Sequence, residues 1–133
     1  MQKIIISESQ KKILSNHADN ERPNESCAVL FGTIDDQKTI VKEIFLTKNI
    51  EESPVNFTIS NEQLIKVYKT AEEKKMEVVS IFHSHPNSEA YPSNTDKKFM
   101  YSNPVVWVIY SGISKEFKAY VFESDVLEIS IET

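Results

Sequence analysis

The chain has 133 residues and a formal net charge of −5, with 40% hydrophobic and 26% charged residues. This length predicts one domain over residues 1–133, and the composition is that of an ordered globular protein rather than a disordered one. The acidic balance argues against a nucleic-acid partner, which would favour a basic surface. No apolar run approaches the roughly 20 residues of a membrane span, so no membrane contact is expected.

The first predicted elements are a short strand and a helix. Residues 4–6 are all isoleucine and predict an opening strand. Ser7 and Gln10 have the spacing of a capping box, in which the serine caps the helix and the glutamine side chain returns to the cap. The helix is expected to continue to about residue 20 and to end before Pro23, because proline cannot donate a backbone hydrogen bond.

A hairpin and a second helix are predicted next. Residues 25–33 and 38–48 are rich in strand-forming side chains and flank a polar turn at residues 35–37, which indicates two antiparallel strands. Ser60 and Gln63 repeat the capping-box spacing before a helical apolar stripe. The second helix should therefore begin just after Ser60.

The remainder predicts four strands and one short helix. Strands are expected at 77–84, 104–110, 117–123 and 126–131, the second of them apolar throughout and so buried on both faces. A third helix is expected from Ser93 to about residue 102. The resulting order, β-α-β-β-α-β-α-β-β-β, indicates an α/β or α+β fold with a curved mixed sheet flanked by helices.

A candidate metal site follows the strand at 77–84. His83 and His85 are two residues apart, so on a strand both side chains point to the same face. Pro86 ends the strand, and Asp96 falls about ten residues later in the first turn of the third predicted helix. The intervening loop is long enough for the Asp96 carboxylate to return to the two imidazoles.

Two histidines and one carboxylate fit a catalytic zinc site, which typically has three protein ligands and leaves one position for water. Zinc lowers the pKa of bound water to about 7 and so supplies a nucleophile at neutral pH. Cys27 is the single cysteine, which rules out a cysteine-based structural site and fits a reducing, cytoplasmic compartment. The same ligand types also hold iron.

Two further residues are candidates for catalysis. Glu25 leads into an apolar strand, an unusual place for a carboxylate, and is a candidate general base. Ser93 could donate a hydrogen bond to an oxyanion. Each has an ordinary structural alternative: Glu25 as a solvated residue, and Ser93 with Asp96 as a helix-capping pair. The two histidines could equally be hydrogen-bonded polar residues of a strand.

The motif as a whole resembles that of the JAMM (MPN+) metalloproteases. It consists of His83-Ser84-His85-Pro86, five residues, then Pro92-Ser93-x-x-Asp96, with Glu25 upstream. The resemblance implies a JAMM/MPN, cytidine-deaminase-like architecture, one zinc ion on the positions of His83, His85 and Asp96, water activation by Glu25 and oxyanion stabilisation by Ser93.

The resemblance also implies a substrate class. JAMM enzymes cut isopeptide bonds after the C-terminal Gly-Gly of ubiquitin or ubiquitin-like proteins. Several members depend on an activating partner subunit, so a homodimer or an activating partner is considered for this chain. Ala28 stands where the family often has glycine. The insertions with which larger members grip ubiquitin chains are missing, since five residues separate Pro86 from Pro92.

Three alternatives remain. His83, His85 and Glu89 match part of a cupin metal site, but no histidine follows His85 and the chain has only two glycines. A non-catalytic scaffold of the same fold would typically have lost some metal ligands. Finally, the same zinc site could process a sulfur-carrier or precursor protein at a linear peptide bond.

Overall fold

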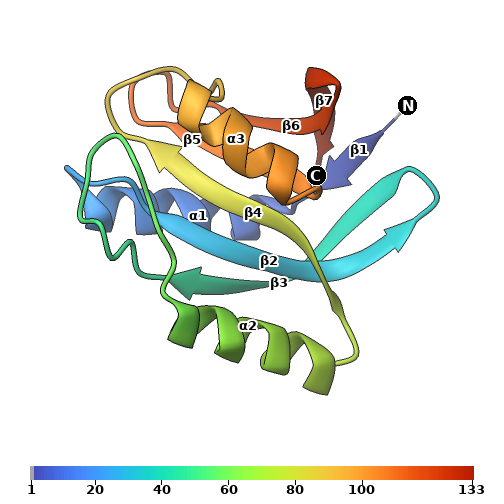
Figure 1. The fold of residues 1–133 in the computed structure, drawn as a ribbon. Coiled ribbons are helices and arrows are strands. Elements are labelled where there is room, and N and C mark those ends of the chain that lie inside the picture. The colour runs from blue at the N-terminus through green and yellow to red at the C-terminus, as the bar shows by residue number, and fades with distance from the viewer. Residues whose placement is uncertain (1) are drawn as a thin grey trace.

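A computed structural model describes residues 2–133 and contains three helices and seven strands in that range (Figure 1). Their order along the chain is β1 (Lys3–Ile5), α1 (Glu8–Glu21), β2 (Cys27–Asp35), β3 (Lys38–Thr47), α2 (Asn61–Glu73), β4 (Glu77–His85), α3 (Asn94–Ser102), β5 (Val106–Ser111), β6 (Phe117–Glu123) and β7 (Asp125–Glu132). Every predicted element is present in the predicted order.

The strands form one mixed sheet that closes on itself in the order β1-β3-β2-β4-β5-β6-β7. β1 lies parallel to both β3 and β7 and closes the sheet, while β4 and β5 are parallel and are connected through α3. The other neighbours are antiparallel. The mixed sheet with flanking helices confirms the predicted fold class; its closure by β1 was not predicted.

Both faces of the central strands are buried because helices cover each face. On β2, Ala28 and Leu30 pack with Leu14 of α1 in the largest apolar cluster. Val29 and Phe31 point the other way and pack with Val67 of α2. Figure 1 shows α1 on one side of the sheet and α2 on the other.

β5 repeats this arrangement. Val106, Val108 and Tyr110 join the cluster beneath α1, while Trp107 and Ile109 pack toward Met100 of α3. All six residues of β5 are buried, as predicted for a strand covered on both faces.

Two predicted details are wrong. β2 begins at Cys27, so Glu25 precedes the strand instead of starting it. At α2, the Ser60 side chain accepts a hydrogen bond from Gln63 N, but the Gln63 side chain accepts from Lys48 N and does not return to Ser60. Both halves of the capping box are present at Ser7 of α1.

Within residues 2–133, none of the helices has the length and apolarity needed to cross a bilayer.

Candidate metal centre

The end of β4 brings two histidine side chains together. His83 and His85 are buried, and their Nε2 atoms lie 3.1 Å apart. Alternation along the strand places both on one face. Neighbouring strands on either side fix the backbone here, since His83 is opposite Cys27 of β2 and Ile109 of β5. The pair is therefore held by the sheet itself.

The first turn of α3 delivers the third side chain. Ser93 is the N-cap of α3, and its Oγ accepts a hydrogen bond from Asp96 N at 3.0 Å. The Asp96 carboxylate in turn accepts from Ser93 N, which completes a capping box. Asp96 Oδ2 also lies 3.1 Å from Nε2 of each histidine. The capping role considered for Asp96 is thus real, and the same oxygen faces the histidines.

Burial and charge act together on this His-His-Asp group (His83, His85 and Asp96). Burial acts to raise the pKa of Asp96, but hydrogen bonds from both histidines and from Ser93 hold it well below its usual range. Burial lowers the pKa of His83 and favours the neutral imidazole. For His85 burial acts in the same direction, but contacts with Asp96 and with the Glu89 carbonyl outweigh it and raise the pKa.

The donor set fits a metal ion such as zinc. One atom from each residue of the His-His-Asp group lies within 4.8 Å of the other two, and all three residues are buried. His85 Nδ1 is 2.8 Å from the Glu89 carbonyl oxygen, a contact that places the proton on Nδ1 and leaves the Nε2 lone pair facing the group. Three lone-pair atoms converging on one point are the usual protein contribution to a catalytic zinc site.

Glu25 lies beside this group although it precedes β2. The register Cys27↔His83 continues past the end of the strand, because Ser26 N donates to Ser84 Oγ and Ser84 N donates to the Ser26 carbonyl. One residue further, Glu25 is opposite His85, and its Oε2 lies 4.0 Å from His85 Nε2. The pairing of β2 with β4 therefore brings the candidate base to the candidate ligands.

The Glu25 carboxylate is in an unfavourable environment for a charge. The residue is 3% exposed, and Oε1 has no hydrogen-bond partner in the described part of the chain. Burial raises its pKa to about 8; the nearby His85 acts to lower it, and Asp96 and Glu51 act to raise it. A carboxyl group with a pKa near the working pH is suited to take up and release a proton.

This raised pKa predicts a pH dependence of stability in the metal-free protein. Glu25 holds its proton up to about pH 8 when folded and up to about pH 4.5 when unfolded. The contribution of Glu25 to the free energy of unfolding is thus fully present below pH 4.5. It is lost as the pH rises to 8, at up to about 1.4 kcal/mol per pH unit. The glutamine of Glu25→Gln is neutral at every pH, so the melting temperature of this variant should rise relative to that of wild type as the pH increases from 5 to 8.5. A difference in melting temperature that stays the same over this pH range would contradict a buried, protonated Glu25.

Hydrogen bonds from the end of β5 hold the loop between β4 and α3 in place. Gly112 N donates to the His85 carbonyl at 2.8 Å, and Ser111 Oγ donates to the Ser88 carbonyl. A Cβ atom on Gly112 would lie 2.5 Å from the Pro86 carbonyl oxygen. Only glycine allows this close approach of the two backbones, which fixes where the chain leaves His85.

Aromatic rings surround His83 and were not found from the sequence. Phe57 stacks on His83 with ring centroids 4.8 Å apart, and Trp107 meets it edge-on at 5.8 Å. Both rings also line an apolar surface pocket of about 190 Å³, together with Ile81 and Phe99. Phe57 lies in an irregular segment with no periodic pattern, so the sequence offered no signal for it.

Other residues considered from the sequence lie outside the site. Cys27 is buried, and burial raises the pKa of its thiol to about 11, which fits an inert cysteine. His17 Nε2 contacts the Cys27 and Thr47 carbonyls and ties α1 to the sheet. Glu89 contributes its carbonyl to His85, while its side chain is exposed and is not part of the metal group, contrary to the cupin alternative.

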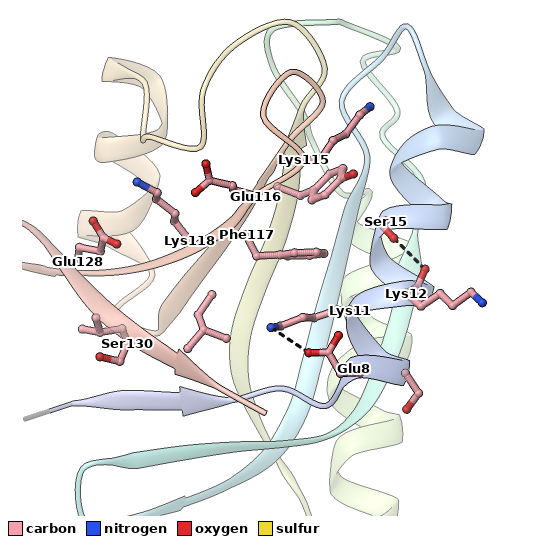
Figure 2. Close-up of a pocket in the computed structure, with 14 residues that line it drawn as sticks. Glu8, Lys11, Lys12, Ser15, Lys115, Glu116, Phe117, Lys118, Glu128 and Ser130 are labelled. Carbon is pink, nitrogen blue, oxygen red and sulfur yellow. Dashed lines mark hydrogen bonds and ion pairs between the residues drawn. The ribbon is translucent and has the colours of Figure 1, made fainter.

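A second, larger pocket of about 820 Å³ lies away from this site (Figure 2). It opens between α1 and strands β6 and β7, with Phe117 among its lining residues. Lysines and glutamates alternate around it, and Lys11 is paired with Glu8. None of the candidate site residues line this pocket, so it is separate from the metal centre.

Comparison with known proteins gives concordant matches. Residues 7–123 match the family described as prokaryotic homologs of the JAB domain. A desampylase from Pyrococcus furiosus is 34% identical over 109 residues, which covers 80% of this chain and 74% of the relative. A CysO-cysteine peptidase from Mycobacterium tuberculosis is 34% identical over 108 residues, covering 81% of this chain and 73% of the relative.

Solved structures match over nearly the whole chain. The solution structure of a protein from Desulfitobacterium hafniense has a TM-score of 0.87 at 25% identity, covering 96% of this chain and 90% of the other. A JAB1/MPN domain protein from Archaeoglobus fulgidus has a TM-score of 0.62 at 18% identity, covering 100% of both chains. The second likeness shows the same fold.

Proposed function

The chain belongs to the family of prokaryotic homologs of the JAB domain and is a JAMM-type metalloprotease, and we propose that it cleaves ubiquitin-like proteins after their C-terminal Gly-Gly. The observation that carries the proposal is the convergence of His83 Nε2, His85 Nε2 and Asp96 Oδ2 at pairwise distances of 3.1 Å. The Glu25 carboxylate, which belongs to a different part of the chain, lies at the edge of that group.

In this proposal the His-His-Asp group holds one zinc ion. Zinc in such a site polarises a carbonyl group and ionises water near neutral pH. Glu25 accepts the proton from the attacking water and delivers it to the leaving amine, a double role suited to a carboxyl group with a raised pKa. The carboxylate of Asp96 stays ionised throughout, because its pKa is held low.

Ser93 is proposed to stabilise the oxyanion of the tetrahedral intermediate. Its side chain is exposed, and Oγ accepts from Asp96 N, while its hydroxyl proton has no acceptor among residues 2–133. That proton is free to be donated to substrate. Oxyanion donors of this kind contribute about 2.7–4 kcal/mol to catalysis.

Ser93→Ala is therefore expected to lower kcat by about 100-fold or more and to destabilise the protein by about 1 kcal/mol through loss of the α3 cap. Ser93→Thr keeps both the cap and the hydroxyl and should restore most of kcat. Steady-state kinetics with thermal melts measure the two effects separately. A Ser93→Ala enzyme with wild-type kcat would exclude the oxyanion role.

The substrate class is supported by the two relatives and by the surface beside the metal centre. One relative is named desampylase and the other CysO-cysteine peptidase. The apolar pocket next to His83 is small and open to solvent, as suits an extended tail rather than a large folded surface. The loop of five residues between Pro86 and Pro92 adds no structure that would select one ubiquitin linkage.

A second candidate within the same chemistry is release of a sulfur-carrier protein from an amino acid. The similarity to a CysO-cysteine peptidase favours it. The scissile bond would then join the carrier's C-terminus to the amine of a single cysteine, and the roles proposed for Glu25 and Ser93 would be unchanged.

Two matched substrates separate these candidates. In one, a ubiquitin-like protein is joined through Gly-Gly to the ε-amine of a lysine; in the other, the same protein is joined to the α-amine of cysteine. We expect the zinc-loaded enzyme to cleave the lysine conjugate. Cleavage of the cysteine conjugate alone would favour the second candidate. Failure with both, combined with stoichiometric binding of the ubiquitin-like protein, would favour the non-catalytic scaffold.

A further inference from the structure

The backbone of Glu25 is held by a loop rather than by the sheet. β2 begins at Cys27, and the Glu25 N–H donates to the Ser53 carbonyl at 2.8 Å. The Glu25 carbonyl accepts from Asn49 Nδ2 at 3.0 Å. Both polar groups of this peptide segment thus depend on residues 49–53, which follow the end of β3.

Asn49 is the centre of that loop. The residue is 3% exposed, and its Nδ2 also lies 2.9 Å from the Asn56 carbonyl oxygen and 3.5 Å from that of Ser53. Its Oδ1 accepts from Glu51 N at 3.0 Å and from Thr58 N at 3.1 Å. The amide donates through its NH2 group and accepts through its oxygen. Losing any of these hydrogen bonds would leave a buried polar group unpaired, so the side chain holds the surrounding loop in one conformation.

The same amide also fixes the ring that covers His83. Asn56 and Thr58, the two neighbours of Phe57, are each bonded to Asn49 through their backbone. Phe57 itself stacks on His83. The Asn49 side chain therefore connects the candidate base, which lies near His85, to the ring that stacks on His83.

We propose that Asn49 is a positioning residue for catalysis, which holds the Glu25 carboxylate beside the His-His-Asp group by fixing the Glu25 backbone. The proposal rests on the role of Glu25 in the proposed function. The hydrogen bonds of the Asn49 side chain go to Glu25 and to the loop at residues 50–58 and not to the three candidate ligands, so its effect passes through Glu25 and that loop.

Asn49→Asp tests the proposal with almost no change of shape. Aspartate retains the acceptor for Glu51 N and Thr58 N but loses the donors to the Glu25, Ser53 and Asn56 carbonyls. Asn49→Ala loses both sets of contacts. Ser7→Ala is the matched control, because it lowers stability by removing the cap of α1, an element that contributes no candidate site residue.

The first readout is amide hydrogen exchange in the metal-free protein, which does not require activity. The Glu25 amide should exchange at least about tenfold faster in Asn49→Asp than in wild type or Ser7→Ala, corresponding to about 1.4 kcal/mol of local stability. The Thr58 amide should keep its protection in Asn49→Asp and lose it in Asn49→Ala. Equal Glu25 exchange in wild type and Asn49→Asp would overturn the proposal.

The second readout is a double-mutant cycle in the zinc-loaded enzyme. Asn49→Asp should lower kcat by about 100-fold with little change in KM and with zinc content unchanged, since small displacements of a reacting group have effects of this size. In the Glu25→Gln background, assayed by single turnover, Asn49→Asp should have almost no further effect. A loss of equal size in both backgrounds would overturn the proposal.

The two readouts distinguish the failure of this inference from failure of the proposed function. If the wild type cleaves neither conjugate, the proposed function fails, while amide exchange still decides whether Asn49 holds Glu25. If the wild type is active and the Glu25 amide is insensitive to Asn49→Asp, only the positioning role is wrong.

Discussion

Glu25→Gln is expected to retain zinc and to lose nearly all turnover. Glutamine has the shape of the protonated carboxyl group but cannot accept and release a proton, and general bases contribute about 10²–10⁴-fold to rate. Glu25 Oε2 is 4.0 Å from His85 Nε2, while Asp96 Oδ2 is 3.1 Å from it, so Glu25 lies next to the metal group without being part of it. Zinc content and kcat, measured on the same preparation, test both halves of this prediction.

Glu73→Gln is the matched control for this variant. Glu73 is an exposed carboxylate at the end of α2, outside the loop that holds Glu25, and the substitution is the same glutamate-to-glutamine change. It should leave kcat within about twofold of wild type, because surface charges act weakly at a distance. Loss of zinc in Glu25→Gln would show that Glu25 is a ligand, and would contradict its assignment as the base.

His85→Ala is expected to abolish both zinc binding and activity. The substitution removes one of three converging lone pairs and leaves His83 and Asp96 as an incomplete site. Zinc content should fall from about one ion per chain to near zero, since catalytic zinc sites typically need three protein ligands. Metal analysis after dialysis against buffer without chelator measures this directly.

His17→Ala is the corresponding control. His17 is half-buried and contacts the Cys27 and Thr47 carbonyls, so its loss should lower stability without lowering zinc content. A His85→Ala protein that remained active with a full complement of zinc would exclude the proposed ligand set.

The His-His-Asp group could be predicted from sequence because its geometry is local. Strand alternation places His83 and His85 on one face, and the Ser93–Asp96 box starts α3 at the right distance. The three residues lie in one short segment of the chain, although contacts from the end of β5 hold the loop between them.

The place of Glu25 depends on strand pairing, which the sequence did not reveal. The residue reaches His85 because β2 and β4 are antiparallel neighbours in the register Cys27↔His83. The observed strand begins two residues after Glu25, and the Ser26–Ser84 contacts extend the pairing beyond the strand. The sequence marked Glu25 as a carboxylate leading into an apolar strand, and the family resemblance pointed to the same residue. The physical cause of its position beside His85 appears only in the folded sheet.

Asn49, Phe57 and the closure of the sheet left no pattern in the sequence. Asn49 follows a strand, and its side chain is bonded to four backbone groups, those of Glu25, Glu51, Asn56 and Thr58, which only the folded chain brings around it. β1 is three residues long and pairs in parallel with both β3 and β7. This pairing depends on strands that are far apart in the sequence and adjacent only in the folded protein. Such features arise from tertiary packing, which local propensity does not encode.

The most direct test of the central claim is removal and return of the metal. Protein stripped by chelator and then dialysed is assayed on the Gly-Gly–lysine conjugate while zinc is added in small steps. We expect no cleavage without metal, and recovery that is complete at about one equivalent of zinc per chain. Cleavage by the metal-free protein at the wild-type rate would contradict the assignment of His83, His85 and Asp96 as a catalytic metal centre.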